Sequence, residues 1–332
     1  DYRETARAVG KEIGIEGGIL TGAELAVMSD AELRERLAGD TNIFARVVPE
    51  HKQRIVTLLQ ELGHIVAMTG DGVNDAPALK KADIGIAVGS GTDVAKEAAD
   101  FVLLDDSFAH IVNAIEEGRG IYDNIQKSIM LLLSGNLGEV LIIFLAVLLG
   151  WNLPLTAVML LWINMVTDGA PALAFSVDGY GRNIMRRPPK KKDEPLLTGA
   201  KLGLIAFMGV TGTLLGLFLF YHFGGISSLE AKLSQARTVV FNFVVLYEMI
   251  LVFLIRKEYE VSFFSNLWVW NSVIFSLLLQ GVLMYTPIAF YFRVTPLSFF
   301  DLAWIVSFGL LFGLIFLVYR FSRSLYLKKI SL

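Results

Sequence analysis

Six long apolar runs constrain this chain more than any other feature of its sequence. They occupy residues 127–150, 154–176, 199–222, 236–255, 268–287 and 300–320. An α-helix needs about 20 predominantly apolar residues to cross the hydrocarbon core of a bilayer, and each run reaches that length. The mean hydropathy of +0.57 agrees with extensive burial in lipid. The second part of the chain is therefore predicted to be an all-helical membrane domain with six spans.

Basic residues are distributed unevenly around these runs. The connection 288–299 holds only Arg293, and 151–153 holds no basic residue. The connection 177–198 and the tail are much richer: they contain Arg182, Arg186, Arg187, Lys190, Lys191, Lys192, Arg323, Lys328 and Lys329. Loops rich in Lys and Arg stay on the cytoplasmic side of a membrane. Because six spans leave both ends on one side, we expect both termini and the soluble part in the cytoplasm.

Three acidic residues fall inside the apolar runs, where a charge is costly. They are Glu139, Asp168 and Glu248. A charged side chain at the centre of a span costs about 2.5–3.5 kcal/mol on insertion scales. No Lys or Arg lies at a matching depth in the sequence. We therefore expect these acids to bind a cation or to carry a proton.

Polar neighbours of two of these acids favour a cation site. Asn136 lies three residues before Glu139, a spacing that places both on one helix face. Asn164 and Thr167 share a face with Asp168 in the same way. The alternative is that the three polar residues form hydrogen bonds between helices. Their combination with the buried acids favours the cation site.

The second span is expected to be broken near its middle. Gly169 and Pro171 directly follow the acid of this span, and proline removes a helical hydrogen bond. Broken helices inside membranes expose carbonyl oxygens that can coordinate ions. The break therefore supports the same prediction of an ion site.

Residues 1–125 have the pattern of a soluble α/β region. Strands are expected at 43–48, 65–68, 84–88 and 101–104, and helices at 1–13, 31–37, 50–62, 76–82 and 93–99. Alternating strands and helices predict a parallel sheet. A polar helical segment at 107–127 leads directly into the first apolar run.

One loop of this region carries a dense set of polar residues. The segment MTGDGVNDAPAL follows an apolar strand, and ligands of open α/β sheets bind at the carboxyl ends of strands. Gly70 and Gly72 allow a sharp turn. Asp71 and Asp75 supply hard oxygen ligands that suit Mg²⁺, and Asn74 can orient a phosphate. The alternative is an ordinary polar turn, because Gly, Asn and Asp dominate turns.

This twelve-residue order resembles the hinge motif of P-type cation-transporting ATPases. The phosphorylation domain of that family has the haloacid dehalogenase-like (Rossmann-like) fold. The resemblance implies catalytic roles for Asp71, Asn74 and Asp75, with Mg²⁺ bound at Asp71, and close approach of Gly72 to the cofactor.

Two further segments of the soluble region resemble the same family. Phe-Ala-Arg-x-x-Pro-x-x-Lys, ending at Lys52, resembles the phosphate-contacting segment. It implies that Lys52 neutralises phosphate charge during transfer, where the alternative is a solvated lysine. Asp1 resembles the last residue of the family's Thr-Gly-Asp triplet, which implies a cofactor-binding role. The alternative for Asp1 is a frayed chain end.

The membrane region resembles the sarco/endoplasmic reticulum type of calcium pump. Asn-x-x-Glu and Asn-x-x-Thr-Asp-Gly-x-Pro look like that family's fifth and sixth helices, and Glu248 falls at a further ligand position. The resemblance implies six ligands of the transported cation: Asn136, Glu139, Asn164, Thr167, Asp168 and Glu248. Glu139 also indicates two ion sites, since relatives with one site lack it. Sodium/potassium pumps are less similar because they carry Asp at the position of Asn164.

The resemblance divides the chain into three parts. They are a partial cytoplasmic phosphorylation domain at 1–108, a stalk helix at 109–126 and a six-helix transport domain at 127–332. The sequence lacks an Asp-Lys-Thr-Gly phosphorylation site, a nucleotide-binding domain, an actuator domain and four earlier spans. We therefore expect it to be the carboxyl-terminal portion of a longer pump. Mg²⁺, ATP and transported Ca²⁺ would be the cofactors, and membrane lipid and the missing amino-terminal half the partners.

Other functions are weaker alternatives. A non-enzymatic membrane protein that binds cations or serves as an assembly fragment would need no phosphorylation site. A pump for Mn²⁺ or Na⁺ is a second possibility, because Mn²⁺ also takes oxygen ligands. A membrane-tethered phosphatase fails because the nucleophilic Asp is absent. The net charge of −3 gives no case for nucleic acid, and the absence of cysteine excludes disulfides.

Overall fold

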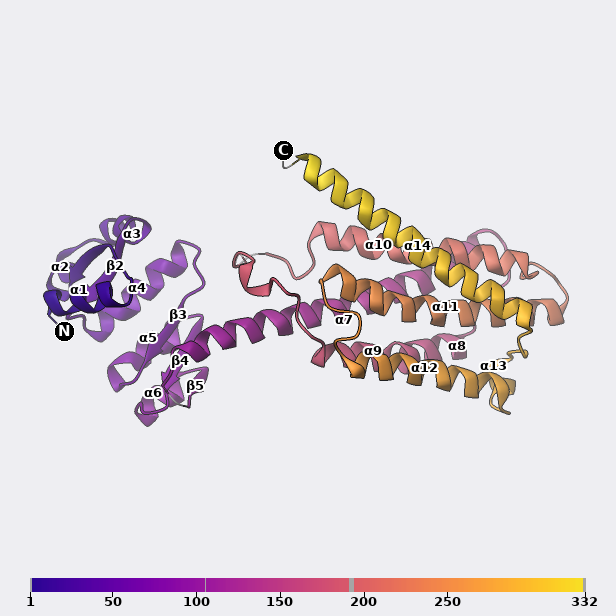
Figure 1. Ribbon diagram of the computed structural model, residues 1–332, viewed down its shortest axis with the longest axis horizontal. Coiled ribbons are helices and arrows are strands. Elements are labelled where there is room, and N and C mark those ends of the chain that lie inside the picture. The colour runs from indigo at the N-terminus through magenta and orange to yellow at the C-terminus, as the bar shows by residue number, and fades with distance from the viewer. Residues whose placement is uncertain (1, 105, 191–193, 331–332) are drawn as a thin grey trace. The chain divides into compact units, whose positions relative to one another are not determined.

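The structure is a computed structural model that describes residues 2–104, 106–190 and 194–330. It consists of two compact units. The first comprises Asp1–Ile115 with Pro188–Glu194, and the second comprises Glu116–Arg187 with Pro195–Leu332. Each unit is described by itself below (Figure 1). Asp1, Lys191 and Lys192 lie outside the described residues.

The first unit alternates short strands and helices. In chain order these are α1 (Arg3–Glu12), β1 (Gly18–Thr21), α2 (Gly22–Val27), α3 (Asp30–Ala38), β2 (Thr41–Ala45), α4 (Pro49–Glu61), β3 (Ala67–Gly70), a 3₁₀ turn η1 (Val73–Asp75), α5 (Ala76–Lys81), β4 (Ile84–Val88), α6 (Asp93–Ala98) and β5 (Phe101–Leu103). All strand pairs are parallel. The predicted alternation of strands and helices is confirmed.

The sheet arrangement differs from the single sheet that was expected. One sheet contains β1 and β2, and a second has the order β3-β4-β5. The sequence analysis missed β1, because its four residues are too short for a periodic pattern. The strand that leads into the MTGDGVNDAPAL loop also begins two residues later than expected, at Ala67. The loop nevertheless follows the carboxyl end of a parallel strand, as predicted.

Helix starts in the first unit follow from local sequence. Thr21 and Glu24 form a capping box at α2, and Ser29 and Glu32 form another at α3. In each case the hydroxyl and the carboxylate satisfy backbone N–H groups that the helix start leaves unpaired. Pro49 begins α4, where a missing N–H costs nothing. These helices close a small apolar cluster around Leu20, Leu25, Leu33 and Leu58. A second cluster, around Leu79, Ala87 and Ala95, is formed by α5, β4 and α6.

The second unit is a bundle of long apolar helices. It contains most of α7 (Ala109–Leu148), α8 (Ala157–Trp162), a π-helical segment η2 (Ile163–Thr167), α9 (Gly169–Ala174), a 3₁₀ turn η3 (Phe175–Val177), η4 (Ile184–Arg186), α10 (Gly199–His222), α11 (Glu230–Glu258), α12 (Leu267–Tyr285), α13 (Ala289–Phe292) and α14 (Phe299–Ile330). Six helical stretches are long and apolar enough to cross a membrane. The six predicted spans are thus confirmed.

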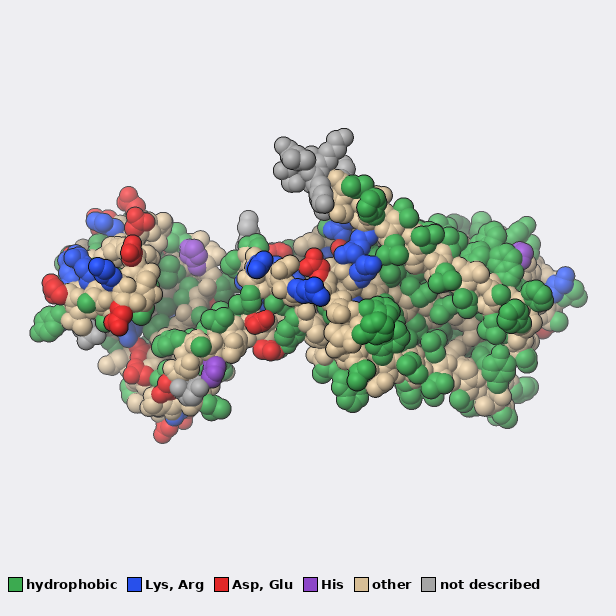
Figure 2. Space-filling model, in the orientation of Figure 1, with side chains coloured by type: hydrophobic (Ala, Val, Ile, Leu, Met, Phe, Trp, Pro, Cys, Tyr) green, Lys and Arg blue, Asp and Glu red, His purple; other side chains and the backbone are tan. Residues whose placement is uncertain are grey.

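The helix α11 lies at the centre of this bundle. In its most apolar window 78% of residues are buried, against 22% for α14. α10 and α14 both pack against α11 (Figure 1). Hydrophobic side chains cover much of the face of this unit that Figure 2 shows. A surface of this composition suits lipid rather than water.

The second span is broken, and the break is π-helical. The N–H of Asp168 donates to the carbonyl of Ile163 at 2.9 Å, a bond across five residues instead of four. Pro171 follows within α9 and has no N–H to donate. The predicted break near Gly169 and Pro171 is therefore present, although it begins earlier, at Ile163. π-Helical segments within α-helices are frequent at functional sites.

Candidate functional sites

The polar loop after β3 is organised around one buried carboxylate. Asp75 is only 5% exposed. Its Oδ2 accepts the backbone N–H groups of Asp71 and Gly72, both at 3.3 Å. Its Oδ1 forms an ion pair with the ammonium group of Lys52 from α4. The structure therefore brings together four of the residues that the sequence analysis selected.

The geometry of this loop requires glycine at position 70. A Cβ atom at Gly70 would lie 2.4 Å from the Cβ of Asp75, which is far inside van der Waals contact. Burial raises the pKa of Asp75, but the hydrogen bond and charge of Lys52, together with the backbone N–H groups of Gly72 and Asp71, outweigh this effect. The pKa of Asp75 consequently lies below its ordinary value of 3.8. Asp75 is thus an ionised, internally paired group.

Asp71 and Asn74 differ from Asp75 in their surroundings. Both are exposed on the loop. An exposed carboxylate is a ligand of the kind that Mg²⁺ takes, since Mg²⁺ is usually bound by one or two carboxylates, water and phosphate. Asp71 thus keeps an exposed carboxylate, while Asp75 is paired with Lys52 and with the backbone of the loop. The described residues contain no group of three or more acidic or histidine side chains that could hold a metal ion alone.

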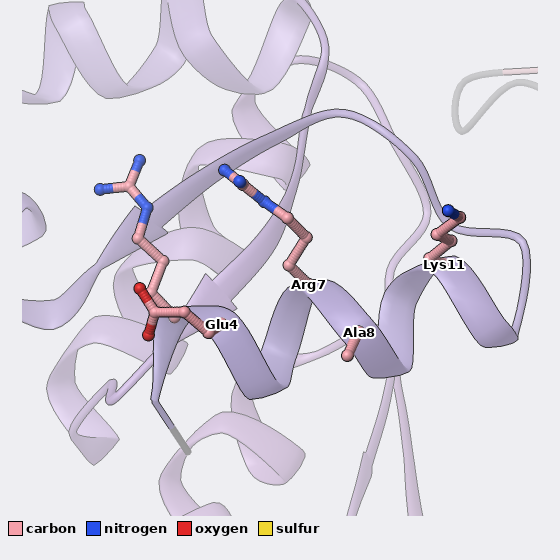
Figure 3. Close-up of a pocket in the computed structure, with 5 residues that line it drawn as sticks. Glu4, Arg7, Ala8 and Lys11 are labelled. Atoms are coloured by element: carbon pink, nitrogen blue, oxygen red, sulfur yellow. The ribbon is translucent and has the colours of Figure 1, made fainter.

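A surface pocket lies elsewhere on the first unit. It is lined by Arg3, Glu4, Arg7, Ala8 and Lys11, four of which are labelled along α1 in Figure 3. Arg3 also pairs with Glu24 at 3.2 Å. No residue selected from the sequence lines this pocket, so it adds nothing to the predicted sites.

The three acids of the spans are almost completely buried in the second unit. Glu139, Asp168 and Glu248 are 4%, 1% and 0% exposed. A Cβ atom at Gly135 of α7 would lie 3.0 Å from Glu248 Oε1 and 3.4 Å from Asp168 Oδ2. The carboxylates of Glu248 and Asp168 therefore both lie beside Gly135. Asn164 donates from Nδ2 to Glu139 Oε2 at 2.8 Å, which connects the third acid to the π segment.

Oxygen atoms in this cluster lack partners. Glu139 Oε1, Asp168 Oδ2, both carboxylate oxygens of Glu248 and the hydroxyl of Tyr247 are buried without a hydrogen bond. Leaving a buried polar group unsatisfied costs about 1–3 kcal/mol, and more for a charged group. No Lys or Arg within the described ranges pairs with these acids. Such a set of bare oxygen atoms is suited to a cation.

The remaining polar residues of the predicted set have different positions. Thr167 is fully buried and donates from its hydroxyl to Ile163 O at 3.0 Å, so its oxygen can still accept. Asn136 is half-buried on α7, and Asn164 is exposed at the surface of the unit. The three acids by themselves do not form a complete ion-holding group within the described residues. Ligands such as these amides and hydroxyls are needed in addition.

The sequence analysis missed a second buried charge cluster. Asp178, just after η3, is 3% exposed and accepts from Lys127 Nζ at 2.9 Å and from Arg256 Nε at 3.1 Å. Asn266 Nδ2 also donates to it at 3.3 Å. These charges lie at the ends of apolar runs, where they are ordinary in sequence. The sequence feature that could have indicated this cluster is the presence of charged residues near the ends of three of the apolar runs.

Fold and sites together define an integral membrane protein in which an α/β unit precedes six spanning helices. Residues 152–322 match the family described as cation transporting ATPase, C-terminus. Residues 1–83 and 53–115 match two families of haloacid dehalogenase-like hydrolases. The chain belongs to the cation-transporting ATPase family. These matches confirm the P-type resemblance and the fold class predicted from the motifs.

The names of individual relatives are more specific than the description of the family. The chain is 44% identical to a calcium-transporting ATPase of Bacillus subtilis, over 86% of this chain and 33% of that protein. It is 52% identical to the endoplasmic reticulum calcium ATPase srcA of Aspergillus fumigatus, over 60% of this chain and 21% of that protein. It is 43% identical to the probable cation-transporting ATPase F of Mycobacterium tuberculosis, over 86% and 33%. The chain spans about a third of the length of the bacterial relatives.

Proposed function

We propose that this chain forms the ion-binding half and part of the phosphorylation domain of an ATP-driven calcium pump. The observation that carries the proposal is the cluster of buried, unpartnered oxygen atoms on α7, the π segment and α11. Ca²⁺ takes six to eight oxygen ligands in flexible geometry, and this cluster supplies only oxygen. The names of the relatives support Ca²⁺ as the cargo.

The ligands of the transported ion would come from three helices. Asn136 and Glu139 lie on α7, Asn164, Thr167 and Asp168 on the π segment and its end, and Glu248 on α11. Because α7 and α11 are continuous while the second span is broken, the π segment is the part that can change conformation at low cost. Movement there would change the access to the ion and its affinity.

The first unit would handle phosphate. Residues 1–108 would be part of the phosphorylation domain, with Asp71 holding Mg²⁺, which neutralises phosphate charge when bound. Lys52 would be held by Asp75 close to the same place, and Asn74 would orient the phosphate. The phosphorylated aspartate and the nucleotide-binding site would come from segments that the longer relatives carry. Positioning and electrostatics supply most of the catalysis in phosphoryl transfer.

The two halves would communicate through α7. This single helix runs from Ala109 to Leu148 and carries both the predicted stalk, 109–126, and the ligand Glu139. The basic connection between the second and third spans supports a cytoplasmic location for the first unit and both termini. Movement of the phosphorylation domain would then reach the ion site along one continuous helix.

The test is ATP-driven uptake of ⁴⁵Ca²⁺ by vesicles that contain the intact native protein. Asp168→Asn should abolish uptake, because it removes a charge from the bare cluster. The matched control is Asp301→Asn, since Asp301 is also buried but accepts from Gln235 and Ser298. Uptake that survives in Asp168→Asn would overturn the assigned ion site.

The phosphate site needs a separate test. Asp71→Asn should lower Mg²⁺-dependent ATP turnover by about 10²–10³, the loss typical when a group that stabilises transition-state charge is removed. Equilibrium binding of ⁴⁵Ca²⁺ should stay unchanged. Loss of both activities together would indicate misfolding rather than a catalytic role for Asp71.

A further inference from the structure

The start of the broken span is tied to two neighbouring helices by a relay of side-chain hydrogen bonds. Trp162, the last residue of α8, donates from Nε1 to Gln280 Oε1 on α12 at 2.8 Å. Gln280 donates from Nε2 to Asn242 Oδ1 on α11 at 3.1 Å. Asn242 then donates from Nδ2 to the carbonyl of Thr238 at 2.8 Å. The relay therefore joins three helices at the residue before the π segment.

Each amide of this relay has only one satisfactory orientation. The indole N–H of Trp162 can only donate, and the carbonyl of Thr238 can only accept. Gln280 must therefore present its oxygen to Trp162 and its nitrogen to Asn242. Gln280 is 5% exposed, and the hydrocarbon region offers no water to replace a lost partner. The relay is thus a defined connection between specific partners.

Packing around Trp162 reinforces the connection. The indole ring meets Phe292 edge-on at 5.6 Å between centroids, and Phe292 stacks on Phe241 of α11 at 6.3 Å. The helix α12 lies along the broken span and packs against both the π segment and α9 (Figure 1). Trp162 is consequently held by hydrogen bonding and by aromatic contact at the same point.

This anchor lies directly before two proposed ion ligands. Asn164 comes two residues after Trp162, and Asp168 directly follows the π segment that begins at Ile163. Within a π-helical segment a backbone N–H takes the carbonyl five rather than four residues back. Fixing Trp162 would hold the start of this segment in place, so the side chains that follow would keep their directions.

We propose that Gln280 is a positioning residue for the ion site. It fixes the amino-terminal boundary of the π segment, which directs Asn164 to Glu139 and Asp168 to the space beside Gly135. Gln280 itself does not contact the ion. The inference rests on the proposed function, because it assigns a role to Gln280 in the binding of the same cation.

The experiment measures equilibrium binding of ⁴⁵Ca²⁺ to the intact native protein in detergent. Gln280→Leu removes the two bonds of the relay that involve Gln280 and should raise the Kd by about 3- to 10-fold, consistent with the modest strength of hydrogen bonds between membrane helices. The number of ions bound per folded molecule should not change. A merely structural role would lower the folded fraction and leave the Kd of that fraction unchanged.

Two further variants sharpen this experiment. Ser272→Ala is the matched control, because Ser272 is buried on the same helix but donates only to Val269 O of its own helix. Its Kd should stay within twofold of that of the parent. Trp162→Phe removes only the first bond, and combining it with Gln280→Leu should raise the Kd no further than Gln280→Leu alone.

The outcomes separate the inference from the proposed function. Binding that is absent in the unmodified protein overturns the proposed function. Binding in the parent that is lost in Asp168→Asn but has an unchanged Kd in Gln280→Leu overturns the inference alone. If Gln280→Leu does not fold, Trp162→Phe decides: a raised Kd supports the inference and an unchanged one overturns it.

Discussion

Two carboxylates of the membrane unit are equally buried but have opposite surroundings. Asp178 and Asp168 are 3% and 1% exposed. Asp178 accepts from Lys127 and Arg256 at 2.9–3.1 Å, whereas Asp168 Oδ2 has no partner. Burial alone therefore says little about the role of an intramembrane acid. A carboxylate whose acceptor positions are filled by the protein holds the fold together, and one whose positions are left open is available to a ligand.

The cluster around Asp178 is satisfied on all sides. Lys127 also donates to Asn124 Oδ1 and to the carbonyl of Gly179, at 2.9 and 3.0 Å. Arg256 also donates to Phe263 O and to Ser265 Oγ. The cluster thus joins α7, the segment after η3, α11 and the connection to α12. Removing one member of such a buried ion pair is costly, because it leaves the other charge buried without compensation.

The largest expected effect is on this saturated cluster. Asp178→Asn leaves Lys127 and Arg256 buried without their counter-charge, so the free energy of unfolding should fall by about 3–5 kcal/mol. Thermal or denaturant unfolding of the intact protein in detergent measures the change. Adding Lys127→Met should recover part of the loss, because one uncompensated charge is then removed. Stability equal to that of the parent in Asp178→Asn would break the comparison.

The same substitution at the unpartnered acid should act in the opposite direction. Asp168→Asn should weaken ⁴⁵Ca²⁺ binding by at least about 100-fold, or roughly 2.7 kcal/mol. Without Ca²⁺ its stability should equal or exceed that of the parent, since a buried charge without a partner has been removed. Unfolding scans with and without Ca²⁺ measure both effects. A loss of stability as large as that of Asp178→Asn would remove the distinction between the two acids.

A glycine substitution sharpens the description of the open cluster. In Gly135→Ala the new methyl group would lie 3.0 Å from Glu248 Oε1 and 3.4 Å from Asp168 Oδ2. We expect ion affinity to fall by about tenfold, or 1.4 kcal/mol, with little change in stability. The control is Gly281→Ala on α12, where a Cβ would meet nothing within 4 Å. Unchanged affinity in Gly135→Ala would show that the ion does not occupy the space between these acids.

The smallest effect concerns Asp75, which resembles Asp178 in being internally paired. Its pKa is lowered, so the ionised form favours the folded state. This contribution is present above the ordinary value of 3.8 and is lost as the pH falls through the lower folded pKa. Asp75→Asn should therefore cost about 1 kcal/mol at pH 7, because water partly screens the pair with Lys52. The difference from the parent should shrink below pH 3.8. A difference that is independent of pH would contradict the ion pair.

The sequence alone predicted those features whose residues differ clearly in chemical character from their neighbours in a short segment. Glu139, Asp168 and Glu248 stand out because their neighbours are apolar, and the motif after β3 stands out because its order is specific. The connections across helices could not be predicted in this way. Asp178 meets Lys127 and Arg256 only after distant segments pack together, and Gln280 finds Trp162 across 118 residues of sequence. The strand β1 depends likewise on pairing with β2.

The π segment also means that the length of the second span carries information. A helix with one residue fewer between Ile163 and Thr167 could form an uninterrupted α-helical ladder with the same composition. Each residue of an α-helix turns the chain by about 100°, since 3.6 residues complete one turn. The wide turn absorbs the rotation of its one extra residue, so a single deletion there would keep Asp168 one turn after Ile163. Two relatives that share every polar residue of this span, but differ by one position in spacing, would therefore present the same acid and differ in whether the turn before it is wide.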